Sequence, residues 1–143
     1  MKPSIADLLP HSPPAVLLQQ IEERGEGSLT ASVILDSIDS PWIEPEGMPV
    51  AFGLEIIAQA AALLISETPR DEEETGRLIG GRLASCNRFS TGIGHLPIEP
   101  KLFVTAELHG ASSMGYFQIH GDIRDARGEL LSVECTVLAL RES

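Results

Sequence analysis

The sequence has little positive charge. Ten lysine and arginine residues stand against 21 aspartate and glutamate residues, which gives a formal net charge of −11 at pH 7. Because proteins that bind nucleic acid normally present a basic stripe, this imbalance argues against a nucleic-acid partner. It argues equally against docking on an anionic membrane surface. The acidic run at residues 71–74 is more typical of a solvated loop than of a site.

Cysteine is also scarce, and the N-terminus lacks a long apolar segment. Cys86 and Cys135 are far apart and do not have the spacing of metal ligands, so no disulfide framework or zinc site follows from them. No metal and no cofactor are expected. The opening MKPSIADLLPHSPP has no apolar core of signal-peptide length, so a cytoplasmic location is expected. With 143 residues and 43% hydrophobic residues, the chain is expected to form one globular domain over residues 1–143.

One apolar stretch, GMPVAFGLEIIAQAAALLISE at residues 47–67, organises the rest of the chain. Its alanine-rich composition and its length predict a helix over residues 50–65, and a helix that is apolar all round is buried. A membrane span is not expected, because such a span needs about 20 apolar residues and this stretch contains Glu55 and Gln59. These two residues are four apart and therefore share one face of the helix. A buried carboxylate is costly unless it is paired, protonated or functional.

The remaining segments are typical of β-strands. Residues 15–21 and 28–35 predict a hairpin with its turn at Gly25 and Gly27. After the helix, strands are predicted at residues 77–87, 101–109, 115–124 and 129–140, and the last three form an antiparallel meander. Residues 36–48 and 88–100 read as loops. A single sheet curled around one helix leaves a face or an edge exposed, so at least a dimer is expected.

Two segments carry a family resemblance. LLPHSPPAVLLQQI at residues 8–21 and GLEIIAQAAALL at residues 53–64 resemble the opening and the central helix of hot-dog-fold 3-hydroxyacyl-acyl carrier protein dehydratases. Within that family, the chain is most similar to the small dehydratases associated with aryl polyene and related lipid pathways. The resemblance implies an α+β hot-dog fold, in which a curved antiparallel sheet wraps around a long central helix. It also implies a homodimer, or a heteromer with a related hot-dog subunit.

The same resemblance implies a substrate and a reaction. The substrate is a 3-hydroxyacyl thioester on the phosphopantetheine arm of acyl carrier protein, and loss of water gives a trans-2-enoyl product. The elimination needs a base for the proton beside the thioester carbonyl and an acid for the departing hydroxyl. A carboxyl group shielded from water can hold a proton near neutral pH, and N–H groups at a helix start can stabilise an enolate oxygen. We therefore expect Glu55 to be the acid/base, Gly53 to contact the carbonyl, and Gln59 to orient Glu55 or a water.

The histidine partner of Glu55 is less defined. The common dehydratases of this fold carry a catalytic histidine in a GHFP-like loop before the central helix, whereas the corresponding loop here has none. His11, in the PH motif, is the first choice, and a histidine that only bonds the backbone of a proline turn is an equal alternative. His95, in the sequence GHLP after the helix, is the second choice. His109 and His120 lie on predicted strands and are expected to be structural or solvent-facing.

Two other functions remain open from the sequence. A thioesterase of the same fold would use the carboxylate to activate water, and a non-catalytic subunit would bind an acyl chain or complete a heteromer. In each case docking of an acidic carrier protein would need a local basic patch. Arg82, Arg88 and Lys101 are the candidates for that patch, with the alternative that they only balance surface charge.

Overall fold

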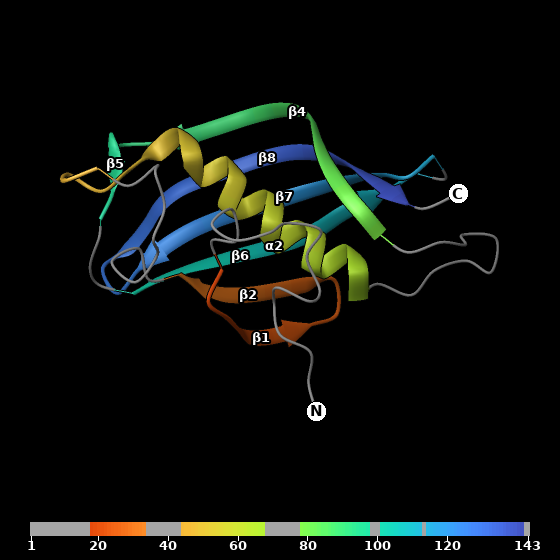
Figure 1. The fold of residues 1–143 in the computed structure, drawn as a ribbon, viewed down its shortest axis with the longest axis horizontal. Coiled ribbons are helices and arrows are strands. Elements are labelled where there is room, and N and C mark those ends of the chain that lie inside the picture. Colours follow the sequence, from red (N-terminus) through yellow and green to blue (C-terminus); the bar gives the residue numbers. More distant parts are fainter. Residues whose placement is uncertain (1–17, 34–43, 68–77, 98–100, 113, 142–143) are drawn as a thin grey trace.

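The computed structural model describes residues 18–33, 44–67, 78–97, 101–112 and 114–141. An antiparallel six-stranded sheet, in the order β1-β2-β6-β7-β8-β4, wraps around one long helix, α2 (Figure 1). A second sheet consists of two short strands, β3 and β5. The elements in chain order are β1 Gln20–Gly25, β2 Ser28–Val33, β3 Met48–Pro49, the 3₁₀ helix η2 Val50–Phe52, α2 Gly53–Glu67, β4 Leu78–Thr91, β5 His95–Leu96, β6 Leu102–Ala111, β7 Tyr116–Asp125 and β8 Gly128–Arg141.

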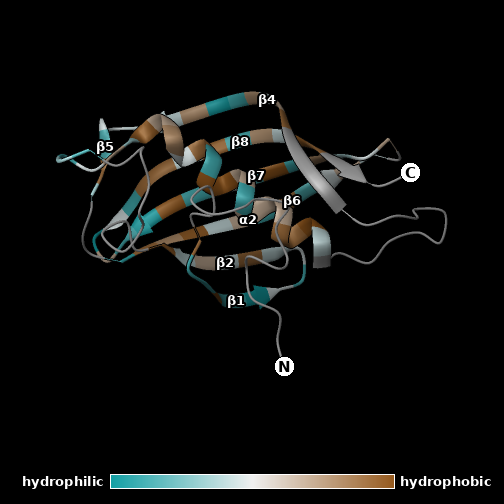
Figure 2. Cartoon of the chain, in the orientation of Figure 1, coloured by the Kyte–Doolittle hydropathy of each residue, from teal (hydrophilic) through white to brown (hydrophobic). Residues whose placement is uncertain are grey.

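Helix α2 forms one side of the core, as its apolar sequence predicts. Every residue from 59 to 65 is buried, so the C-terminal half of the helix is enclosed all round. The helix contacts β2, β4, β6, β7 and β8, and Figure 2 shows hydrophobic segments on both the helix and the strands behind it. Among the described residues, none of the helices has the length and apolar character needed to cross a membrane.

The central strands supply the other side of the core through two-residue alternation. On β6, Leu102, Val104 and Ala106 are fully buried, while the residues between them are partly exposed. Successive side chains of a strand point to opposite faces, so this alternation directs one row towards α2 and the other towards solvent. The same alternation holds for the buried residues of β7 and β8, which are Phe117, Ile119, Ile123, Leu131, Val133, Cys135 and Val137.

The hairpin and the meander predicted from the sequence are confirmed, with changes at their boundaries. β1 pairs with β2 around Gly27, whose φ of 70° suits glycine in a turn. Residues 15–17 of the predicted first strand lie outside the described residues, and within the described part the strand runs from Gln20 to Gly25. β6, β7 and β8 are consecutive antiparallel neighbours. The predicted loop at residues 88–100 is wrong in part, because β4 continues to Thr91 in register with Leu131 of β8.

The two cysteines lie opposite each other, although 48 residues separate them in the sequence. Cys86 on β4 and Cys135 on β8 are register partners, and both thiols are free. Burial, together with the neighbouring Cys86, raises the pKa of the Cys135 thiol to about 11. Cys135 is therefore an inert core residue at neutral pH, since the thiolate is the reactive form of cysteine.

A glycine permits the close contact between α2 and the middle of the sheet. A Cβ atom at Gly121 of β7 would overlap the side chain of Ile57 on α2. We expect Gly121→Ala to lower the free energy of unfolding by about 1–3 kcal/mol, because overpacking forces neighbouring side chains from their preferred positions. Urea denaturation measures the change.

Gly92→Ala is the matched control for this prediction. A Cβ atom there has no heavy atom within 4 Å, so the change in unfolding free energy should stay within about 0.5 kcal/mol. Equal effects of the two substitutions would show that the contact between Gly121 and Ile57 is not a tight one.

Candidate functional site

The carboxylate singled out in the sequence lies at the edge of the core, in the first turn of α2. Glu55 is half-buried, and its Oε1 accepts a hydrogen bond of 3.2 Å from Nε2 of Gln59. Gln59 is completely buried. The four-residue spacing thus places both residues on one face, as predicted, and the buried amide restricts the half-buried carboxylate. A half-buried carboxyl group held in this way is suited to proton transfer.

Gly53 begins α2 and is closely surrounded. A Cβ atom there would lie 2.5 Å from Cδ2 of Leu131 and 3.3 Å from Cδ1 of Ile123, so any larger residue would have to displace the Leu131 side chain. Its N–H is directed at the carbonyl oxygens of Val50 and Ala51 in η2. A substrate carbonyl at Gly53 would therefore have to share or displace this hydrogen bond.

The small β3–β5 sheet lies against the start of the helix. Met48 pairs with Leu96 and Pro49 pairs with His95. The N–H of Val50 then donates a hydrogen bond of 2.9 Å to the carbonyl oxygen of Gly94, so that η2 and the residue before β5 are joined directly. The segment that leads into Glu55 is thus held by a strand that is about 40 residues further along the chain.

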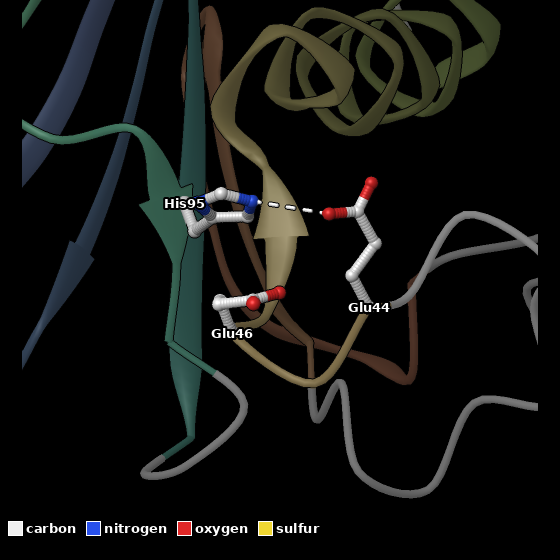
Figure 3. A group of neighbouring side chains, drawn as sticks. All are labelled: Glu44, Glu46 and His95. Carbon is white, nitrogen blue, oxygen red and sulfur yellow. Dashed lines mark hydrogen bonds and ion pairs between the residues drawn. The ribbon is translucent and has the colours of Figure 1, made fainter.

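The four histidines are the candidates for the partner of Glu55, and those that the structure describes lie in two separate places. His11 lies outside the described residues, so its relation to Glu55 stays a prediction. His95 on β5 places Nε2 3.3 Å from Oε2 of Glu44, and Glu46 lies beside them (Figure 3). His109 on β6 and His120 on β7 stack on each other, with ring centroids 5.6 Å apart, on strands as predicted.

Comparison with known proteins identifies the family. A model of the ApeP-like family, described as ApeP dehydratase, matches residues 3–142. The chain belongs to the ApeP-like dehydratase family. No match to it is found among curated protein sequences.

Solved structures show that this ApeP-like chain has the hot-dog fold. The dehydratase heterocomplex ApeI:P from Xenorhabdus doucetiae is similar with a TM-score of 0.85 and 18% identity, over 99% of this chain and 94% of that chain. The PaaI protein of the phenylacetic acid degradation operon of Escherichia coli gives 0.62 and 8%, over 83% and 81%. A hypothetical thioesterase with coenzyme A from Streptococcus pneumoniae gives 0.63 and 11%, over 86% of both chains. The predicted curved sheet around one helix is confirmed.

Two of the candidate basic residues of this ApeP-like dehydratase, Lys101 and Arg88, lie at opposite edges of the sheet. Lys101 precedes β6 and pairs with Glu22 on β1 at 3.0 Å, and it also lies 5.7 Å from the ring centroid of Phe103. Arg88 is exposed on β4, at the opposite edge of the sheet. The side chain of Arg82 is outside the described part. A docking surface that combines Lys101 with Arg88 is therefore not supported within one chain.

The sequence interpretation of this ApeP-like chain missed the group formed by Glu44, Glu46 and His95. The sequence offers His95 only as the second choice for the partner of Glu55, and it places both glutamates in the predicted loop at residues 36–48. The one available signal is GHLP at residues 94–97, in which a histidine follows a glycine and precedes Leu96 and Pro97. Nothing in that signal indicates that residues about 50 positions earlier meet it.

Proposed function

We propose that this protein removes water from 3-hydroxyacyl thioesters carried on acyl carrier protein and forms trans-2-enoyl thioesters. The observation that carries the proposal is the pair Glu55 and Gln59 in the first turns of the central helix of an ApeP-like dehydratase. The carboxylate is half-buried, and a fully buried amide holds one of its oxygens. In this proposal the carboxyl group of Glu55 carries a proton to or from the substrate.

The elimination can be written with each proton and electron pair assigned. A base removes the proton from C2, and the C–H electron pair forms the C2=C3 double bond by way of an enolate-like thioester. The C3–O bond then breaks, and the hydroxyl leaves as water after it takes a proton from an acid. Glu55 holds or supplies one of these protons, and His11 is proposed as its partner. His95 is the second choice for the partner.

Two further residues support these steps in the proposal. Gln59 fixes the rotamer of Glu55, so the Glu55 side chain loses less conformational entropy when the substrate binds. Gly53 is proposed to contact the thioester carbonyl, at the positive end of the α2 dipole where negative charge develops in the transition state. The hydrogen bond from its N–H to η2 means that this contact requires a shift of the helix start.

The proposed assembly contains a second hot-dog subunit. The similar structure from Xenorhabdus doucetiae is a heterocomplex, which supports a heteromer, and the sheet of the described residues has an edge strand that could pair with a second subunit. β4 is the last strand of the sheet, and residues 83–90 on it are all exposed. Leu83 and Phe89 are each 38% exposed there, and an exposed edge strand with apolar side chains is a template for pairing with another chain.

The test is a mass-spectrometric assay of a 3-hydroxyacyl thioester on acyl carrier protein. We expect the wild-type protein to convert the substrate to a product lighter by one water, with the thioester intact. Release of the free carrier thiol without an enoyl product would overturn the proposal in favour of thioester hydrolysis. No product from the protein alone, but faster dehydration by a partner subunit when it is added, would instead make this chain a non-catalytic subunit.

A further inference from the structure

Three potential metal ligands converge beside the start of α2, in a group that does not include Glu55. They are the carboxylates of Glu44 and Glu46 and the imidazole of His95. Figure 3 shows the glutamates on the segment before β3 and the histidine on β5. One ligand atom from each residue lies within 4.8 Å of the other two. The group therefore combines one nitrogen donor with two oxygen donors, and all three are within the reach of a single ion.

The measured separation fits the coordination sphere of a small divalent ion. Nε2 of His95 and Oε2 of Glu44 are 3.3 Å apart. Two ligands that are each about 2.0–2.1 Å from a tetrahedral zinc ion are roughly 3.3–3.4 Å from one another. The separation of these two atoms is thus that of two ligands of one ion, and Glu46 offers a carboxylate oxygen within 4.8 Å of both residues' ligand atoms.

Backbone hydrogen bonds hold the segments that carry the three residues together. Glu44 and Gly47 exchange two hydrogen bonds of 2.9 Å, which close a tight turn and carry both glutamates on one short unit. His95 is fixed to the same unit, because its strand pairs with β3. At Gly47, φ is 121°, and a Cβ atom would collide with the carbonyl oxygen of Leu96, so the turn keeps this shape only with glycine.

The charge of the group favours a cation. Two carboxylates and one imidazole lie together, and no lysine or arginine whose side chain the structure describes forms an ion pair with either glutamate. Glu44 and His95 have side chains that are 53% and 36% exposed, so an ion can enter from solvent and retain water as a further ligand. A bound divalent ion would neutralise both carboxylates.

We propose that Glu44, Glu46 and His95 bind a divalent first-row transition-metal ion of the zinc class. The imidazole selects against Ca²⁺ and Mg²⁺, which prefer oxygen ligands alone, whereas Zn²⁺ and its neighbours accept a mixed set of nitrogen and oxygen donors. The ion would tie β5 to the turn before β3, which leads through η2 to α2. Its proposed role is to stabilise the segment that leads into α2. This inference does not depend on the proposed dehydration.

The experiment is calorimetric titration of the untagged, metal-stripped protein with Zn²⁺ in a non-chelating buffer at pH 7.5. It is carried out in a Cys86→Ser background, so that the exposed thiol does not compete as a ligand. One Zn²⁺ ion per chain is expected, and Mg²⁺ in large excess should not displace it. Glu46→Gln and His95→Ala should each weaken the affinity by at least about 100-fold, since even outer-shell residues of metal sites are worth about 10–100-fold.

The matched control is the other exposed pair of histidine and glutamate. His109 on β6 lies 3.4 Å from Glu107, and the described residues supply no second carboxylate there that completes a three-ligand group. His109→Ala should therefore leave Zn²⁺ affinity unchanged. Absence of Zn²⁺ binding by the wild-type protein would overturn the proposal. A lower Zn²⁺ affinity in His109→Ala, with unchanged affinity in Glu46→Gln and His95→Ala, would also overturn the proposal. Far-ultraviolet circular dichroism checks that all variants are folded.

Discussion

Replacing Glu55 with glutamine is expected to abolish dehydration of 3-hydroxyacyl thioesters while leaving the fold intact. Glutamine has almost the same shape as glutamate and can still accept the hydrogen bond of 3.2 Å from Gln59. It cannot take up or release a proton, and a positioned acid or base contributes about 10²–10⁴-fold to a rate. We therefore expect kcat to fall by at least about 100-fold in the mass-spectrometric assay, with little change in KM.

The control for this prediction removes one negative charge elsewhere. Glu129 is exposed on β8, and Glu129→Gln should keep the full rate. Thermal unfolding should place both variants close to the wild type, because the Glu55 side chain is only half-buried and glutamine conserves its volume. If Glu55→Gln kept more than about half of the wild-type rate, the carboxylate would not be the acid/base, and the assignment of the site to the face of Glu55 and Gln59 would fail.

The features predicted correctly from the sequence are those that depend on residues close to one another along the chain. The helix follows from an apolar, alanine-rich run, and the pairing of Glu55 with Gln59 follows from their four-residue spacing. The helix begins at Gly53 and not at residue 50, because the three residues after Pro49 form the tighter 3₁₀ turn η2. Such a turn at the end of a helix leaves no distinct mark in an apolar sequence.

Other features depend on pairing between distant segments and could not be predicted from local patterns. β4 extends through residues 88–91 because β8 provides a partner strand there, as in the pairing of Ser90 with Ser132. β3 and β5 are two residues long, which is too short to show any periodicity. The approach of Glu44 to His95 depends on that pairing, so the candidate metal group appears only once the chain is folded.

Placing negative charges on β4 is expected to break the proposed contact with a second hot-dog subunit. Leu83 and Phe89 are exposed on this edge strand, and burying a large apolar side chain contributes about 1.5–3 kcal/mol. The double variant Leu83→Glu, Phe89→Glu removes both contributions and leaves carboxylates without partners. Since 1.4 kcal/mol is a tenfold change in affinity, the dissociation constant should rise by at least about 100-fold, as measured by sedimentation equilibrium.

Strand β1 at the opposite edge of the sheet and the exposed residues Met114 and Tyr116 provide controls for this prediction. β1 is only six residues long and carries three charged side chains, so it is protected against edge-to-edge pairing, whereas β4 has 14 residues and no acidic ones. The double variant Met114→Glu, Tyr116→Glu adds the same charge at two exposed apolar positions away from β4 and should leave the assembly intact.

If the wild-type chain sediments as a monomer alone, the same two variants are compared after co-expression with hot-dog dehydratase subunits of its own organism. Equal assembly of the β4 variant and its control would show that the subunits meet through another surface.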